Sequence, residues 1–435
     1  MSVKEFDPLL MAKKSKTFCI FPWIHQYIGP PGDVKPCCVY DGLKEIGSLK
    51  KNTLEEIWNN ENTREMRLQF LNGQEHPNCS ICNNRAEIGD AFYNRYNEVF
   101  FTNHEEVQQI VASTREDGSL PNHKLFYIDV RFNNLCNFSC RSCAPHFSTS
   151  WVADHKKLYN RKDEKYGFTF PGKTEDQALE EILPHLEHAE MIYFAGGEPL
   201  MQKEHYEVLN KLIELEKFDV DIRYNTNFSN FKLKNYDDVI EYWKKFKKVS
   251  VNASLDGSHA KGEYWRKGTD WEMTVNNRKR LKEECPHVQF NISYTLSWPN
   301  ALNLTEFHKE WVELGFINPD NIMINPLDTP SYYCLKNLPD WKKTEIEKWF
   351  NNHIDWIKTL DPIFHGVIGR YENAIKFMWS DVSKEQSLDD SLKFFSRITK
   401  KLDSIREESF FDVFPEHKNI EYYLTQNDLH DEFYY

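Results

Sequence analysis

Six short apolar segments, each followed by a polar loop and most by a helical stretch, constrain the fold of this chain most strongly. Short apolar runs of this kind are typical of parallel strands, which are buried on both faces, and helices are their usual crossover connections. We therefore expect an α/β fold in which six strands form a parallel sheet, closed or partly closed as a TIM-like barrel. The expected strands are residues 125–131, 191–195, 220–224, 249–253, 288–296 and 322–324.

Helical patterns separate these strands, and further helices with aromatic stripes follow the last of them. Aromatic residues at helical spacing usually form a core, so we expect a packed helical extension at the C-terminal end. At about 150 residues per domain, 435 residues suggest roughly three units. The predicted segments are a tail (1–17), a cysteine-rich module (18–100), a linker (101–123), the barrel (124–335) and the helical region (336–435).

Charge and hydropathy exclude several classes of function. The chain has 54 Lys and Arg against 67 Asp and Glu, a formal net charge of −13, and no basic tract. Nucleic-acid binding is therefore not expected. No apolar run approaches the ~18 residues of a membrane span, and residues 1–16 lack the apolar core of a signal peptide. We expect a cytoplasmic protein with reduced thiols and no membrane contact.

The ten cysteines divide into two groups of metal-ligand type and three others. The first group is a compact triplet, Cys136-x3-Cys140-x2-Cys143, in the loop after the first expected strand. The second group lies upstream in the sequence and comprises Cys19, Cys37, Cys79 and Cys82. Lone cysteines are usually small buried apolar residues, so we interpret Cys38, Cys285 and Cys334 as structural, although Cys38 adjoins a candidate ligand.

Each group is open to two interpretations. A zinc ion would need a fourth ligand in addition to the triplet. A [4Fe–4S] cluster held by the triplet would instead keep one iron open, which is what a chelating small molecule requires. For the upstream four, spacing alone does not separate a zinc knuckle from an iron–sulfur cluster. The 16 histidines show no HExxH spacing, so a mononuclear metal site of that kind has no support.

Other polar motifs follow the later strands. Gly196-Gly197-Glu198-Pro199 follows the second strand, where the glycines would let backbone approach a ligand closely. Glu198 could equally be a helix N-terminal carboxylate. Asn225-Thr226-Asn227 and Ser254-Leu255-Asp256-Gly257 follow the next two strands, and Ser254 and Asp256 could simply shape a turn.

Together these residues resemble the radical S-adenosylmethionine (SAM) superfamily over about 125–327. The triplet matches the motif that holds the SAM-binding [4Fe–4S] cluster, and the GGEP loop matches the one that binds the SAM amino group. The resemblance implies a SAM site made of Gly196, Gly197, Glu198, Asn227, Ser254, Asp256 and Arg266, the last as a carboxylate-binding arginine that could otherwise be a surface ion-pair partner. The chain departs from the family at Ser142, where an aromatic residue usually packs near adenine, so Phe138 or Phe147 would have to cover it.

The N-terminal segment resembles the SPASM/twitch auxiliary-cluster module of the same superfamily. The matching features are Phe18-Cys19-Ile-Phe-Pro-Trp23, Gly32-x4-Cys37, Ile46-Gly-Ser-Leu49, Leu54-Glu-Glu-Ile-Trp58 and Cys79-x2-Cys82. The family places this module after the barrel, whereas here it precedes the barrel. Four cysteines rather than seven imply one auxiliary [4Fe–4S] cluster, as in the twitch variety, with every iron ligated by protein.

The resemblance implies an oxidoreductase that cleaves SAM reductively to a 5′-deoxyadenosyl radical, which abstracts hydrogen from a substrate. A peptide or protein side chain is the first expectation, with the auxiliary cluster as electron relay and flavodoxin or ferredoxin as donor. The alternatives are an oxidoreductase of a small metabolite, such as an amino sugar or cofactor precursor, and an iron–sulfur electron carrier without turnover. Tyr294, Ser297 and Asn325 lie at expected strand ends without an assigned role, and no catalytic residue is assigned.

Overall fold

The computed structural model describes residues 6–41, 45–80, 82–83, 92–160, 167–381 and 388–420. The chain divides into two compact units. The first comprises residues 1–135, 168–224 and 233–249, and the second comprises residues 136–167, 225–232 and 250–435. The division falls within two strands, β6 (Asp221–Thr226) and β7 (Lys248–Ala253).

In the first unit the strands are ordered β3-β2-β1-β4-β5-β6. Strand β4 pairs in parallel with β5, and β5 with β6, as expected for successive strands of a barrel. The N-terminal hairpin extends this sheet, because β1 pairs in parallel with β4, with His25 opposite Tyr127 and Ile28 opposite Val130. The remaining strands are β1 (His25–Ile28), β2 (Asp33–Lys35), β3 (Gly47–Ser48), β4 (Tyr127–Val130) and β5 (Met191–Phe194).

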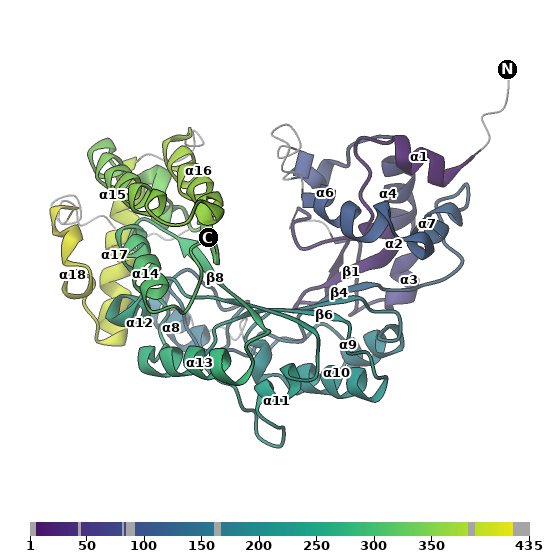
Figure 1. Cartoon of the computed structure of the whole chain (residues 1–435), viewed down its shortest axis with the longest axis horizontal. Coiled ribbons are helices and arrows are strands. Elements are labelled where there is room, and N and C mark those ends of the chain that lie inside the picture. Colours follow the sequence, from purple (N-terminus) through teal and green to yellow (C-terminus); the bar gives the residue numbers. More distant parts are fainter. Residues whose placement is uncertain are drawn as a thin grey trace. The chain divides into compact units, whose positions relative to one another are not determined.

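Helices cover both sides of this part of the sheet (Figure 1). On one side Phe194 contacts His205 of α10 (Lys203–Glu214), and Tyr224 contacts Trp243 of α11 (Val239–Trp243). On the other side Tyr127 packs against the rings of residues in the N-terminal helices. The other helices are α1 (Pro8–Lys14), α2 (Phe21–Ile24), α3 (Leu54–Trp58), α4 (Glu61–Leu71), α6 (Phe92–Asn97), the π-helix η2 (Glu98–Thr102), α7 (Glu105–Ala112) and α9 (Gln177–Ile182).

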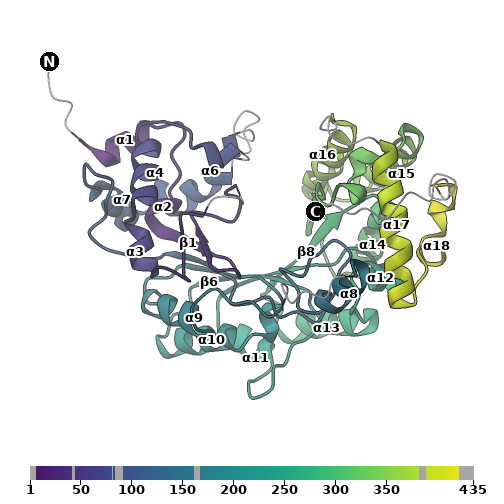
Figure 2. The ribbon, with the colours of Figure 1, turned by 180° about the vertical axis from the view of Figure 1, so that it is seen from behind.

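In the second unit β7, β8 (Gln289–Leu296) and β9 (Ile322–Pro326) are ordered as in the chain and pair in parallel. Helix α17 (Leu388–Arg406) packs against α8 (Trp151–Leu158), which follows the cysteine triplet, through a cluster that includes Ile398 and Trp151 (Figure 2). The other helices are α12 (His259–Trp265), α13 (Trp271–Glu284), α14 (Ala301–Glu313), α15 (Asp340–Lys358), α16 (Ile368–Trp379) and α18 (Phe410–Val413).

The predicted fold class is confirmed: parallel strands alternate with helices, and a helical region follows the last strand. All six expected strands are present, displaced by no more than a few residues at their ends. The strands β1 to β3 were not predicted, because they are only two to four residues long and carry little periodicity of their own. In the part of the chain that the structure describes, no helix is long and apolar enough to cross a bilayer.

Candidate functional site

The GGEP loop packs directly on the backbone that precedes Cys136. Gly196 has φ +123°, and a Cβ on Gly197 would lie 2.1 Å from the carbonyl oxygen of Leu135. The N–H groups of Gly197 and Glu198 donate to the carbonyl oxygens of Asn133 and Leu135, at 3.2 and 2.7 Å. Both glycines are therefore required by close backbone approach and, at Gly196, by a left-handed conformation.

Glu198 lies at the end of this loop with a buried side chain. Its Oε1 accepts a hydrogen bond from the N–H of Leu200 at 3.1 Å, at the start of the short helix η4 (Pro199–Met201). In this structure the carboxylate therefore acts as an N-terminal cap. A capping carboxylate remains an acceptor, and this site offers carboxylate and carbonyl oxygens to a ligand that donates hydrogen bonds.

The cysteine triplet lies in a loop in which the Cys136 sulfur accepts hydrogen bonds. The N–H of Phe138 donates to Cys136 Sγ at 3.4 Å, and Asn227 Nδ2 donates to the same sulfur at 3.9 Å. Burial, together with the neighbouring Cys140 thiol, raises the pKa of Cys143 to about 12. Donors aimed at sulfur favour the thiolate form that a metal ligand requires.

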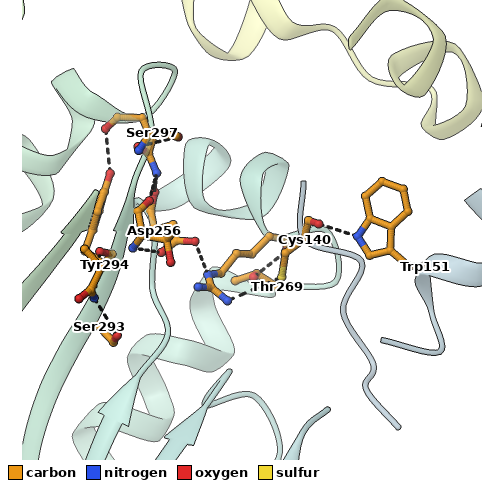
Figure 3. A network of polar contacts seen from close by, with 11 residues as sticks. Cys140, Trp151, Asp256, Thr269, Ser293, Tyr294 and Ser297 are labelled. Carbon is orange, nitrogen blue, oxygen red and sulfur yellow. Dashed lines mark hydrogen bonds and ion pairs between the residues drawn. The ribbon is translucent and has the colours of Figure 1, made fainter. Parts of the chain in front are cut away.

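Arg266 joins Cys140 to Asp256, two positions that the sequence placed in one site. Its Nη1 donates to Cys140 Sγ at 3.7 Å, and its Nε lies 2.8 Å from Asp256 Oδ2 in a buried ion pair (Figure 3). Burial lowers the pKa of Arg266, but Asp256 and Cys140 raise it more, so that the guanidinium stays charged. The guanidinium therefore sets a fixed positive charge beside one of the predicted cluster ligands.

Asp256 is in turn held by the ends of β8 and α14. Its Oδ1 accepts from the N–H of Thr295 at 2.7 Å, and its carbonyl oxygen accepts from Asn300 Nδ2 at 3.0 Å. Asn300 also accepts from the N–H and hydroxyl of Ser297, and its carbonyl oxygen accepts from Tyr294 Oη (Figure 3). Tyr294 and Ser297 thus support the loop that carries Asp256.

The backbone of the cysteine loop is tied to the C-terminal helices. Arg141 lies between two of the cysteines and is buried. Its Nη2 bonds Asp403 Oδ1 at 2.5 Å and Glu408 Oε2 at 2.8 Å, and its guanidinium lies 3.7 Å from the centre of the Tyr264 ring. Arg406 Nη2 donates to the carbonyl oxygen of Ser139 at 2.7 Å. The helical region predicted from aromatic stripes therefore holds the loop in place.

The four N-terminal cysteines interact with one another in the first unit. Burial, together with the nearby thiol of Cys82, raises the pKa of Cys79 to about 12. Burial raises the pKa of Cys37 well above its ordinary value, with added repulsion from Cys19, Cys38 and Cys79. The structure thus brings these four thiols close enough to interact electrostatically.

Other predicted residues make only local contacts. The N–H of Ser254 donates to the carbonyl oxygen of Thr226 at 2.8 Å, and Asn325 donates to Ser293 Oγ at 3.2 Å. Of the two aromatic residues considered for adenine, Phe138 is buried against Gly268, whereas Phe147 is half exposed. Within the described ranges, no three His, Cys, Asp or Glu side chains lie close enough together to hold a single metal ion.

Two segments of the chain match known protein families. The family described as "Radical SAM superfamily" matches residues 130–296, and the SPASM family, "Iron-sulfur cluster-binding domain", matches residues 19–84. The chain therefore carries a radical SAM domain and an iron–sulfur cluster-binding domain. The SPASM match lies before the radical SAM match, in the order that the resemblance of the N-terminal segment implied. A search of curated proteins finds no match.

Two solved structures are among those that the chain matches in part. One is of anSMEcpe with bound AdoMet, 21% identical over 51% of this chain and 56% of that chain, with a TM-score of 0.35. The other is of Streptococcus suis SuiB bound to precursor peptide SuiA, 17% identical over 66% of this chain and 62% of that chain, also with a TM-score of 0.35. The match therefore spans less than two thirds of the length of either solved chain.

Sequence reasoning missed several residues of the site. Asn300 and Thr295 hold Asp256, while Arg141, Asp403 and Glu408 anchor the cysteine loop. Arg141 is visible in the sequence as a basic residue between two cysteines of the triplet. Its partners Asp403 and Glu408 could not be predicted, because they lie more than 250 residues further along the chain. Asp129 was also visible, as an acidic residue inside an apolar strand, and Cys38 interacts electrostatically with it.

Proposed function

We propose that this protein is a radical SAM enzyme in which Cys136, Cys140 and Cys143 hold a [4Fe–4S] cluster that binds SAM. When bound, the cluster supplies the electron that cleaves SAM to a 5′-deoxyadenosyl radical, which takes a hydrogen atom from the substrate. The observation that carries the proposal is the hydrogen bond from Arg266 to Cys140, together with the Arg266–Asp256 ion pair.

The donor set supports a cluster at the triplet. Three thiols in one loop match the ligand number of a cluster with one open iron, and N–H donors point at two of the sulfurs. Such hydrogen bonds set the reduction potential of iron–sulfur clusters. A polynuclear cluster spreads its ligands further apart than one metal ion does, which is consistent with the absence of a single-ion site among the described residues.

The chemistry of the residues that the family resemblance assigns to the SAM site supports SAM binding. The ammonium of SAM is a donor, and the Glu198 carboxylate and the loop carbonyls are acceptors. Arg266 has N–H groups beyond those used by Asp256 and Cys140, and a guanidinium binds a carboxylate well. Asn227, Ser254 and Asp256 would lie by the ribose and carboxylate, as the family resemblance implies.

The proposal is tested by SAM cleavage under anaerobic conditions. Reconstituted protein with dithionite and SAM should give 5′-deoxyadenosine, and Cys140→Ala should abolish it. Cys285→Ala is the matched control, because Cys285 is a buried cysteine outside both groups and its loss should leave cleavage unchanged. Cleavage that persists in Cys140→Ala would exclude the triplet as the cluster site, and an inactive wild type with full iron would exclude the function.

For the substrate we propose a peptide or protein side chain, with the auxiliary cluster of Cys19, Cys37, Cys79 and Cys82 as electron relay. The combination of a radical SAM barrel with a SPASM-type domain supports this class. Host-cell extract should stimulate 5′-deoxyadenosine formation, and protease treatment of the extract should remove the stimulation. Stimulation that survives protease and passes a small-molecule filter would instead establish a small metabolite as substrate.

A further inference from the structure

A row of polar side chains crosses one face of the sheet in the first unit. Tyr27 of β1 is opposite Asp129 of β4, Asp129 is opposite Tyr193 of β5, and Tyr193 is opposite Arg223 of β6. We call these four residues the Asp129 row. Because successive side chains of a strand point to opposite faces, the row shares a face, and the apolar residues next to it share the other.

The two faces are distinguished by what covers them. The apolar face, with Phe194 and Tyr224, packs against α10 and α11. The face of the Asp129 row is covered at the start of the strands by aromatic residues of α2, α6 and η2, which pack on Tyr127. The Asp129 row lies two residues further along the strands than Tyr127, toward their carboxyl ends, where barrel enzymes have their active sites.

Asp129 is the unusual member of this row. Its side chain is fully buried, and neither carboxylate oxygen accepts a hydrogen bond among the described residues. In the part of the chain that the structure describes, Asp129 forms an ion pair with Arg131, whose Nη2 lies 3.7 Å from Oδ1. Buried carboxylates almost always accept hydrogen bonds, because burying one without them is costly. A ligand that donates to Asp129 would remove this cost.

The surrounding charges indicate what kind of donor fits. Arg131 balances Asp129, and it also donates to Tyr27 Oη and stacks over the Tyr27 ring at 4.5 Å. Arg223 is paired with Asp221 at 2.6 Å, and Lys35, which lies opposite Tyr27, is paired with Asp33 at 3.3 Å. The neighbourhood is therefore electrically neutral, and a cationic ligand would meet Arg131. A neutral hydroxyl or amide group satisfies Asp129 without adding charge.

We propose that the Asp129 row is a substrate subsite in which Asp129 accepts a hydrogen bond from a neutral hydroxyl or amide N–H group of the substrate. This inference deepens the proposed function, on which it rests. Tyr27 and Tyr193 flank the carboxylate on the neighbouring strands and offer hydroxyl groups and ring surfaces to the same group. Arg131 positions Asp129 by ion pairing.

Ligand-observed saturation-transfer NMR on the SAM-loaded holoenzyme tests the subsite. The probes are N-acetylserinamide, which carries neutral hydroxyl and amide donors, agmatine, which is a cation, and acetate, which is an anion. We expect N-acetylserinamide alone to bind wild type, and Asp129→Leu to weaken it by at least about tenfold through loss of a charge-assisted hydrogen bond. Asp129→Asn keeps the volume and one acceptor, so it should bind the probe with intermediate affinity.

Asp221→Asn is the matched control, because Asp221 is an acidic residue on the same sheet face whose carboxylate is already paired with Arg223. It should change probe binding less than twofold. Failure of N-acetylserinamide to bind wild type, equal binding by Asp129→Leu, or preferential binding of agmatine would each overturn the inference. SAM cleavage is measured in the same preparations, without substrate. If wild type cleaves SAM and the probe does not bind, only the subsite fails; if SAM is not cleaved, the proposed function fails whatever the probe does.

Discussion

At Gly197 the absence of a side chain lets the GGEP loop pack directly against the backbone of Leu135. A Cβ at this position would lie 2.1 Å from the Leu135 carbonyl oxygen, far inside any real contact. Gly197→Ala must therefore displace the GGEP loop from the segment that leads into Cys136. We expect 5′-deoxyadenosine formation to fall at least about tenfold, since small displacements of positioning groups cost that much. The same assay on purified, reconstituted protein measures it.

Gly369→Ala is the control for this substitution. A Cβ at Gly369, in α16, meets nothing within 4 Å, so alanine should leave SAM cleavage unchanged. It should also stabilise the helix by less than about 1 kcal/mol, because alanine is the better helix former and position 369 lies in the first turn. Equal activity of Gly197→Ala and Gly369→Ala would show that the close approach to Leu135 is not needed for cleavage.

The charge of Asp129 predicts a pH dependence of stability. Burial raises the pKa of Asp129 to about 6, and Arg131 opposes the rise. A carboxyl whose folded pKa is raised destabilises the protein where it is ionised, so its cost is full above pH 6 and disappears below its ordinary pKa. Compared with Asp129→Asn, wild type should be less stable by about 3 kcal/mol above pH 7, and this difference should fall by about half at pH 5.

Urea unfolding of wild type and Asp129→Asn at several pH values measures this difference. The comparison cancels other titrating groups, including His25, whose pKa burial lowers to about 4. A stability difference that does not change between pH 7.5 and 5 would show that Asp129 is not held ionised at a cost. A more stable Asp129→Asn at neutral pH fits a residue retained for binding rather than for folding.

At the residue scale, the sequence indicated the members of the site better than their contacts. The joint placement of Asp256, Arg266 and Cys140 was implied by family motifs, and the structure connects the three directly. The isolation of Asp129 could not be predicted in this way. It depends on which side chains β1 and β5 place opposite it, and strand register is set by long-range pairing rather than by the local pattern.

At the element scale, the order of strands and helices was predictable because each strand of a parallel sheet carries its own apolar signal. The pairing of β1 with β4 could not be predicted from the sequence, because β1 is only four residues long and its partner strand lies far along the chain. The same limit applies to the C-terminal region. Its helices were expected from their aromatic residues, but the contact of α17 with the cysteine loop depends on Arg141 and Arg406, which show no local periodicity.

The anchoring of the cysteine loop by the C-terminal helices gives a prediction for Asp403→Asn. Arg141 is 1% exposed at its side chain and pairs with both Asp403 and Glu408. Asp403→Asn removes one of the two carboxylates that bind this buried guanidinium and leaves Glu408 in place, so the free energy of unfolding should fall by about 2 kcal/mol, the loss of one charged hydrogen bond. Because Arg141 lies between two predicted ligands, iron content should fall as well. Chemical unfolding and iron analysis measure the two effects.

Glu313→Gln is the matched control, since it breaks an exposed ion pair. Lys309 and Glu313 lie 3.8 Å apart on α14 with side chains 48% and 62% exposed. Such pairs contribute less than about 0.5 kcal/mol, and neither stability nor iron content should change measurably. If Asp403→Asn behaves like Glu313→Gln, the C-terminal helices do not anchor the loop.

At the scale of the whole molecule, the chain carries a SPASM-type domain before its radical SAM domain, and the sheet continues between them through β1 and β4. The four thiols Cys19, Cys37, Cys79 and Cys82 belong to the same unit as this pairing and interact with one another. A cluster held by all four, as we propose, would have every iron ligated by protein, which suits electron transfer better than substrate ligation. We therefore expect its loss to spare SAM cleavage.

The double variant Cys79→Ala/Cys82→Ala tests this division of roles. With one [4Fe–4S] cluster at each site, wild type should hold about eight irons and the variant about four. The variant should still form 5′-deoxyadenosine, because the triplet is intact, whereas formation of the oxidised product should fail for lack of an electron acceptor. Cys140→Ala should show the converse, with the auxiliary cluster retained and SAM cleavage lost. Stoichiometric zinc in place of the second cluster would contradict the proposed electron-relay role, since zinc accepts no electron. The N-terminal site would then be a structural zinc knuckle.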